Sequence, residues 1–138
     1  MSSLYRFGVS LEKGLIEKFD TLIKNQRYSN RSEAIRDLIR KELVKQSWSE
    51  DKVVAGTISL VFDHHKRQLS ATLLDIQHDY HSLILSSQHI HLDHSNCFEV
   101  LCVKGKALDV QALAFKLKAQ KGVVHCELSM SSTGSNLS

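Results

Sequence analysis

The sequence contains no long hydrophobic run. Its apolar stretches all fall short of the ~20 residues that a membrane-spanning helix needs, so we expect no membrane association. The N-terminal stretch MSSLYRFGVSLEKG also lacks the basic region and apolar segment that mark a secretory signal peptide. We therefore expect a cytoplasmic protein.

Cysteine is scarce and odd in number. Cys97, Cys102 and Cys126 are widely spaced, which argues against a disulfide framework and for a reducing compartment. Cys102 and Cys126 each lie in an apolar stretch and are most simply small core residues. In a reducing compartment, a thiol beside histidines, such as Cys97, can bind a metal ion.

The sequence also lacks an internal repeat, a glycine-rich phosphate loop and a separate nucleophile–base pair. What is there, 138 residues of which 42% are hydrophobic and 24% charged, is typical of one ordinary globular domain or two small ones. The charge is unevenly placed. Residues 1–46 hold ten Lys or Arg against six Asp or Glu, a net of +4, whereas the remaining residues hold eight against nine. An anionic partner is therefore indicated for the first segment only.

The N-terminal segment predicts one strand and two helices. Strict alternation of apolar and polar residues in YRFGVSL (5–11) is typical of a short strand. Apolar residues spaced by three and four predict one helix over about 15–26 and a second helix that follows Asn30 and ends at about 45. Asn30, followed three residues later by Glu33, forms a capping-box-like start for the second helix.

One strand and two helices cannot bury a core alone, and a lone strand leaves both edges unpaired. We therefore expect two copies to pair their strands antiparallel. The resulting ribbon would expose Arg6, Gly8 and Ser10, and a two-stranded ribbon fits the DNA major groove. The start of the second helix, with Arg31 and Ser32 in its first turn, offers backbone N–H groups to a phosphate.

Beyond a polar stretch at 46–52, the pattern changes to alternating strands and helices. We expect strands at 54–62, 81–92, 97–105 and 123–130, and helices at 66–80 and 109–120. The order βαββαβ predicts an α+β, ferredoxin-like split sheet with two helices on one face. The expected organisation is therefore a DNA-binding and dimerisation domain at 1–46, a linker at 47–53, a ferredoxin-like domain at 54–130 and a disordered tail at 131–138.

A cluster of histidines precedes Cys97. His89 and His91 stand two apart on a strand, so both imidazoles leave the same face. A three-residue loop at 93–95 would place Cys97 opposite His91, with Cβ atoms ~5 Å apart. The same register would place Glu99 opposite His89, as a hydrogen-bond partner for its second ring nitrogen. A two-residue loop would instead turn Cys97 to the other face.

A fourth ligand is suggested by His78, which lies about 180° around its helix from the apolar stripe that begins at Leu69. It shares this outer face with Ala71 and Leu74, so we expect it to reach the site across an interface between chains. Three imidazoles and one thiolate suit tetrahedral zinc, square-planar nickel or tetragonal copper, and the spacing does not choose among them. Taken singly, four other histidines are most simply solvated: His64, His65, His94 and His125.

The chain resembles the nickel-responsive ribbon-helix-helix repressors, the NikR family, over nearly everything from Arg6 to Met130. The motifs that carry the resemblance stand in the family's order and spacing: NRSEAIRD (30–37), HKRQL (65–69), QH (77–78), HIHLDHSNC (89–97) and VLCVKG (100–105). The resemblance implies a homotetramer with four central ferredoxin-like (ACT-type) domains and a DNA-binding dimer at each end.

The resemblance also implies one Ni(II) per chain, held square-planar by His89, His91 and Cys97 together with His78 of a neighbouring chain. Three further residues are expected beside these ligands: Gln77, Glu99 and His64. Bases would be read at Arg6, Gly8 and Ser10, and the DNA backbone would be held by Arg31, Ser32, Lys66 and Arg67. Glu33 and Asp37 match positions that can bind a weaker cation, although a solvated acidic face explains them equally well.

Two residues depart from the family pattern. Gly8 occupies a ribbon position where Thr or Ser is common, so a side-chain base contact is absent there. Phe62 stands where tyrosine is common, which removes a hydroxyl hydrogen bond near the metal. Neither departure removes a ligand.

The sequence therefore predicts a nickel-dependent repressor of palindromic operator DNA, acting on nickel-uptake genes. One alternative is a metal-independent, antitoxin-like ribbon-helix-helix repressor whose C-terminal domain binds a small molecule or a protein. The other is a small metallohydrolase. The hydrolase is disfavoured because a fourth ligand, the His78 imidazole, would occupy the open position that catalytic zinc keeps for water.

Overall fold

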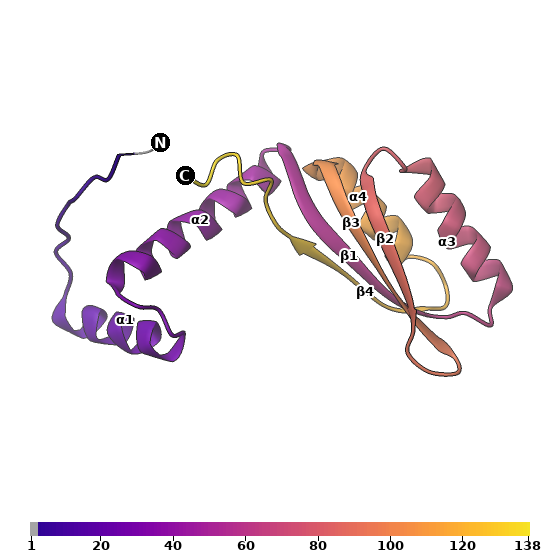
Figure 1. The fold of residues 1–138 in the computed structure, drawn as a ribbon, viewed down its shortest axis with the longest axis horizontal. Coiled ribbons are helices and arrows are strands. Elements are labelled where there is room, and N and C mark those ends of the chain that lie inside the picture. The colour runs from indigo at the N-terminus through magenta and orange to yellow at the C-terminus, as the bar shows by residue number, and fades with distance from the viewer. Residues whose placement is uncertain (1–2) are drawn as a thin grey trace. The chain divides into compact units, whose positions relative to one another are not determined.

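The computed structural model describes residues 3–138, which form two compact units. One unit comprises the chain up to Leu43 together with Asn136–Ser138, and the other comprises Val44–Ser135. The order of elements along the chain can be followed by colour in Figure 1. No helix among the described residues is long and apolar enough to cross a membrane.

The N-terminal unit contains α1 (Lys13–Asn25) and the first part of α2 (Arg31–Ser49). The Asn30 side-chain oxygen accepts a hydrogen bond from the Glu33 backbone N–H at 2.9 Å, which confirms half of the predicted capping box. The other half is absent, because the Glu33 carboxylate pairs with Arg36 instead.

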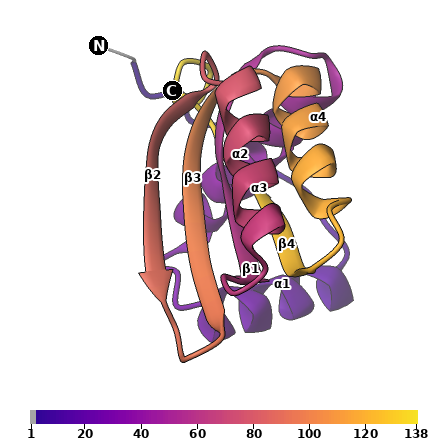
Figure 2. The same ribbon diagram turned by 90° about the vertical axis from the view of Figure 1, so that its right-hand side faces the viewer.

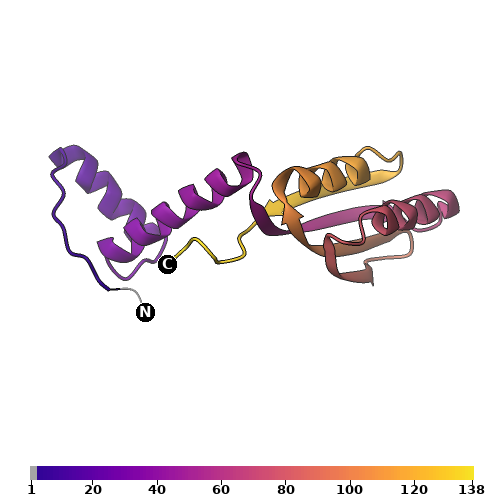
Figure 3. The same cartoon turned by 90° about the horizontal axis from the view of Figure 1, so that it is seen from above.

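The strand expected at 5–11 is not formed within the single chain. Residues 3–12 approach α1 without helix or strand, as Figure 3 shows. A strand is defined by hydrogen bonds to a neighbour, and this segment finds none among the described residues of its own chain. Its apolar side chains are exposed, among them Tyr5 and Phe7. Within this unit, Ile23 and Ala34 are the buried apolar side chains that the structure describes, so its core is small.

The start of the linker expected at 47–53 is wrong, because α2 continues to Ser49. Trp48 is only 4% exposed, packs in the core of the C-terminal unit and donates its indole N–H to the Ser131 carbonyl at 2.9 Å. A Cβ at Gly56 would lie only 2.6 Å from the Ser129 carbonyl oxygen, so glycine is required where this strand passes Ser129, beside the Trp48 ring. One large apolar residue in a polar stretch carries no periodic signal, which is why the pattern missed it.

The C-terminal unit has the predicted order βαββαβ. Its elements are β1 (Val53–Asp63), α3 (Arg67–Asp79), β2 (Ile84–His91), β3 (Asn96–Lys106), α4 (Ala107–Lys118) and β4 (Val123–Met130). The strands lie in the order β2-β3-β1-β4, with all neighbouring pairs antiparallel. Each helix connects two strands with a third between them, which is the ferredoxin-like arrangement. Figure 2 shows α3 and α4 together on one face of this sheet.

The core fills the space between the sheet and the two helices. Burial alternates along β1 and β3, so that Ile58, Leu60, Leu101 and Val103 are buried and their neighbours are not. Cys102 lies between two of these buried residues and therefore faces the opposite side of the sheet. It is half-buried, so its expected place in the core is wrong.

Cys126 is also half-buried, but it packs against the core and its thiol lies 3.8 Å from the Ala114 carbonyl.

The tail at 131–138 has no helix or strand. It was expected to be disordered, but some of its residues make hydrogen bonds to the rest of the chain. The Ser131 backbone N–H donates to the Ala55 carbonyl at 2.9 Å and thereby continues the direction of β4 by one residue. In the N-terminal unit, Arg40 donates to the Leu137 carbonyl at 2.8 Å.

Candidate metal centre

The hairpin of β2 and β3 has the predicted register. His91 stands opposite Cys97, and His89 stands opposite Glu99. The connection is the three-residue loop 93–95, closed by a hydrogen bond from the Leu92 backbone N–H to the Asn96 carbonyl at 2.9 Å. The Asp93 carboxylate holds this loop by accepting bonds from the backbone N–H groups of Ser95 and Asn96 at 2.9 and 2.8 Å.

Three metal-ligating side chains meet at the turn end of this hairpin. The ligand atoms of His64, His91 and Cys97 all lie within 4.8 Å of one another. The Cys97 sulfur is 3.3 Å from Nδ1 of His91. Cys97 is fully buried, and this burial, reinforced by the nearby Glu99 carboxylate, raises the pKa of its thiol. A cation bound here would therefore have to displace the thiol proton.

His64, which the sequence analysis expected beside the ligands, lies within the three-residue group itself. It follows β1, and its backbone N–H donates to the Ser95 carbonyl at 3.1 Å. Its ring Nε2 lies 2.7 Å from the His94 carbonyl. A carbonyl oxygen can only accept, so Nε2 carries the proton and Nδ1 of the neutral ring keeps its lone pair for a metal. The sequence could not reveal this, because His64 lies 27 residues from His91 and two loops bring them together.

His89 is oriented by a buried carboxylate rather than drawn into this three-residue group. Its Nδ1 lies 3.2 Å from Oε2 of Glu99, which leaves Nε2 as the nitrogen with a lone pair. The other Glu99 oxygen accepts a hydrogen bond from Gln77 at 2.5 Å, so the carboxylate joins α3 to β2. The ring centroids of His89 and His91 are 5.4 Å apart. The Phe62 ring meets the His89 ring edge-on, with centroids 5.8 Å apart. Phe62 is the residue that stands where the resembled family commonly has tyrosine.

His78 lies on the exposed side of α3 and does not join the group of three within one chain. Its ring stacks on His81 at 5.9 Å. The helix residues that share its outer side include Leu74, which is 67% exposed, whereas Leu69, Leu73 and Ile76 are buried against the sheet as predicted. The expected contact of His78 with another chain stays a prediction.

The donors present suit a borderline divalent metal ion. Imidazole nitrogen together with a thiolate favours zinc, copper or nickel over the hard cations that prefer oxygen ligands. The carboxylate behind His89 fixes one ring nitrogen, as occurs for metal-bound histidines. The residues that the structure brings to this end of the sheet therefore fit a metal of this class.

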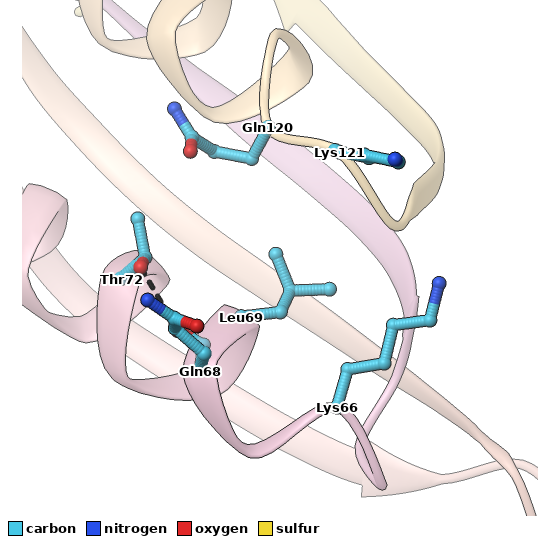
Figure 4. A pocket seen from close by; sticks show the side chains of 6 residues that line it. All are labelled: Lys66, Gln68, Leu69, Thr72, Gln120 and Lys121. Carbon is cyan, nitrogen blue, oxygen red and sulfur yellow. Dashed lines mark hydrogen bonds between the residues drawn. The ribbon is translucent and has the colours of Figure 1, made fainter.

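The residues expected to contact DNA are exposed, as such a role requires. They are Arg6, Gly8, Ser10, Arg31, Ser32, Lys66 and Arg67. Lys66 is the N-cap residue of α3, and Arg67 begins the helix. Figure 4 shows that Lys66 shares an open hollow with Gln120 and Lys121 from the turn after α4. Gln120 and Lys121 were not singled out from the sequence, because only the fold brings them beside Lys66.

Three charged residues of the N-terminal unit already have partners within it. Arg31 makes two hydrogen bonds to Asp20, at 2.9 and 2.8 Å. Asp37 pairs with Tyr28 and with Lys41, and the Tyr28 hydroxyl is the main cause of its lowered pKa. With Glu33 held by Arg36, a cation at Glu33 and Asp37 would have to displace these partners.

Comparison with known proteins gives two family matches. The model described as "NikR C terminal nickel binding domain" matches residues 55–131, and "Ribbon-helix-helix protein, copG family" matches residues 5–46.

Several curated proteins are similar over nearly their whole length, and those described below share the name "Putative nickel-responsive regulator". The protein of Chlorobium phaeobacteroides is 57% identical over 132 residues, covering 96% of this chain and 98% of the relative. The protein of Syntrophus aciditrophicus is 54% identical over 134 residues, covering 97% and 98%. The protein of Nitratidesulfovibrio vulgaris, strain Miyazaki F, is 51% identical over 138 residues, covering 99% of each.

Proposed function

The chain belongs to the nickel-responsive regulators, in which a ribbon-helix-helix segment precedes a nickel-binding C-terminal domain, and on this premise we propose that it represses transcription when nickel is bound. The observation that carries the proposal is the pairing of His91 with Cys97 at the end of a hairpin. Imidazole and thiolate are donors that nickel, copper and zinc sites use, and a bound ion would take the place of the thiol proton.

The proposed ligands of Ni(II) are His89, His91 and Cys97 of one chain and His78 of a neighbouring chain, with one ion per chain. This assignment is supported by the shared face of the first three residues and by the exposed position of His78. Bound nickel would supply a charge and a set of bonds that tie two chains together at this point. Such bonds favour a homotetramer with two DNA-binding dimers.

The proposed DNA contacts divide into two kinds. Arg6, Gly8 and Ser10 would lie in the major groove of a palindromic operator, where base edges are read. The DNA backbone would be held by Arg31, Ser32, Lys66 and Arg67. Operator binding requires the compartment that holds the chromosome, so the proposed site of action is the cytoplasm, and the proposed targets are nickel-uptake genes. No catalytic step is part of this function.

Hydrogen bonds connect the proposed ligand His89 to α3, the helix whose first residues are proposed to hold the DNA backbone. Glu99 bonds to His89 on one side and to Gln77 on the other, and Gln77 belongs to the helix that begins at Arg67. Metal affinity and DNA affinity are then linked through the position of α3. The coupling equals the difference in metal affinity between the DNA-gripping and non-gripping conformations, and it acts equally in both directions.

The test is a Ni(II) titration of reduced, metal-free protein followed by absorption, with Cys97→Ala alongside. We expect a thiolate-to-nickel band that saturates at one ion per chain and is absent from the variant. The same samples are then tested for operator binding with and without nickel. DNA affinity that does not depend on nickel would support the metal-independent repressor instead, and a band that persists without Cys97 would refute the ligand assignment.

A further inference from the structure

Helix α4 is apolar on two opposite sides. Val110, Leu113 and Leu117 are fully buried against the sheet. On the opposite side, Leu108 is 62% exposed and Phe115 is 75% exposed. Figure 2 shows α4 on the helix-bearing face of the sheet, and no described element of its own unit covers its outer side. A helix that is apolar all round is normally buried, so a partner is indicated for this outer side.

The exposed apolar residues of α4 have the spacing by which two helices pair. They form a stripe, here called the α4 seam, that consists of Leu108, Ala112, Phe115 and the C-cap residue Ala119. Intervals of four, three and four residues keep these side chains on one side of the helix, as at the contact line of a coiled coil. The small Ala112 in the middle allows a second helix to approach closely. The α4 seam is therefore typical of a surface that packs against another helix.

The charged residues beside the α4 seam favour one direction for the partner helix. Asp109 and Lys116 are seven residues apart, so both lie along the same edge of the seam. The Lys116 ammonium lies 5.7 Å from the centre of the Tyr80 ring. Gln111 and Lys118 lie along the other edge. In an antiparallel helix pair each edge meets the same edge of the partner, whereas in a parallel pair it meets the opposite edge.

Antiparallel pairing of two copies of α4 gives both charges an opposite partner. With the Ala112 residues of the two copies at the crossing point, Asp109 of each copy lies within one residue of Lys116 of the other. The same alignment brings each Leu108 beside the Phe115 of the other copy. Within residues 3–138 of one chain, neither Asp109 nor Lys116 forms an ion pair. A parallel pair would face Lys116 with Gln111 and leave both charges unpaired.

We propose that the α4 seam binds the α4 seam of a second copy, antiparallel, and thereby joins separate assemblies of this chain. The contact lies apart from the proposed DNA contacts and nickel ligands, because α4 carries none of them. Two 12-residue helices are too short to bury the ~1,200 Å² of a standard interface, so a single contact is weak. It gains strength where several copies are held close together, as on one DNA molecule, because their effective concentration is then high.

Sedimentation velocity of the full-length protein over a range of concentrations measures this pairing. The native protein should form species larger than its smallest assembly, in a proportion that rises with concentration. Phe115→Glu places a charge inside each contact and should weaken the association at least about tenfold. Circular dichroism should show an unchanged fold, because the Phe115 side chain is outside the core.

Two charge reversals test the direction of pairing. Asp109→Lys and Lys116→Asp each replace two attractive contacts with repulsive ones, and each should weaken the association by about three- to tenfold. An equimolar mixture of the two variants should restore it, because the lysines of one variant then face the aspartates of the other. Lys118→Asp is the matched control on the opposite edge. It should not weaken the association, since no acidic residue of the second copy faces it.

A native mass that does not change with concentration would overturn the proposal, as would a Phe115→Glu variant that associates like the native protein. Failure of the mixture to restore association would also overturn it. Binding to phosphatidylglycerol vesicles that requires Phe115, without self-association, would assign the seam to a membrane surface instead. The proposed function is judged separately, because the α4 variants should retain the nickel band that Cys97→Ala removes. Absence of that band from the native protein would refute the proposed function and leave the pairing of α4 standing.

Discussion

At the scale of single residues, the buried carboxylate of Glu99 orients His89 in the candidate metal centre. It is 8% exposed and accepts hydrogen bonds from both Gln77 and His89. A charge buried to this degree needs such partners, because an unpaired carboxylate in the interior costs several kcal/mol. Its place was predictable from the hairpin register alone, since Glu99 lies directly opposite His89.

Glu99→Gln should lower nickel affinity by about 10–100-fold, because a neutral amide orients and polarises the His89 ring less than a carboxylate does. The measurement is Ni(II) affinity by competition with a chelator, read from the thiolate-to-nickel band, with circular dichroism to show that the fold is retained. Glu127→Gln is the matched control, since Glu127 lies on β4 and is exposed. Equal losses in both variants would contradict the role of Glu99.

A second residue-scale feature is the pairing of Arg31 with Asp20. An exposed ion pair of this kind is weak, so Asp20 can compete with a phosphate for Arg31 without preventing its binding. Asp20→Asn should therefore strengthen DNA binding by about two- to fivefold at all sequences. Fluorescence anisotropy over a range of salt concentrations measures this. Glu17→Gln removes an equal charge from α1 and should have a smaller effect.

The same pair makes a prediction about pH. The hydrogen bonds from Arg31 lower the pKa of the Asp20 carboxyl below its ordinary value of about 3.9. A lowered folded-state pKa contributes stability above the ordinary value, and this contribution is lost as the pH falls through the lower one. Thermal unfolding curves of the native protein and of Asp20→Asn should thus differ at neutral pH and converge in acid. A difference that is constant with pH would contradict this account.

At the scale of elements, the β2–β3 hairpin positions the proposed ligands His91 and Cys97 through its turn. Asp93 accepts bonds from two backbone N–H groups and from the Asn96 side chain, and these bonds lower the pKa of its carboxyl. A three-residue loop closed in this way fixes the register that pairs His91 with Cys97. A shift of one residue would turn Cys97 to the other face of the sheet.

Asp93→Ala should weaken nickel binding, because the loop loses the acceptor that selects its conformation. We expect a loss of about tenfold, comparable to that of an indirect partner of a ligand. Asp93→Asn keeps an acceptor oxygen and should retain most of the affinity, which distinguishes the turn from the negative charge. Both are measured by the same nickel competition. Similar losses in the two variants would mean that the charge, rather than the turn, matters.

Most elements of the C-terminal domain could be predicted because each has one buried face with a clear period. The strands alternate and α3 places Leu69, Leu73 and Ile76 on one side, so the sequence carries the signal directly. The extension of α2 through Trp48 and the approach of His64 to His91 could not be predicted. Both depend on contacts between segments distant in sequence, and no local pattern encodes them.

At the scale of the whole molecule, the N-terminal unit has more apolar side chain than one copy can bury. Tyr5, Phe7 and Val9 are between 60% and 87% exposed, and they alternate with Arg6 and Gly8. This is the pattern that two paired ribbons would bury, with the polar residues turned toward a groove. We therefore expect this segment to form its strand only by pairing with a second copy.

Phe7→Glu should prevent this pairing and abolish operator binding. If the C-terminal domains associate separately, the mass of the proposed tetramer should fall by half, which sedimentation velocity measures. Arg6→Ala alters the opposite side of the same segment, so it should retain the mass while losing discrimination between operator and unrelated DNA. An unchanged mass for Phe7→Glu would contradict the paired ribbon.

The burial of Trp48 has a consequence for how the molecule can be observed. It is the chain's single tryptophan, and its indole lies in the core of the C-terminal domain. Its emission consequently reports the unfolding of that domain, whereas far-ultraviolet dichroism also follows the helices of the N-terminal unit. Denaturation curves recorded with the two probes coincide only if both domains melt together. The chain thus contains its own optical label for one of its two halves.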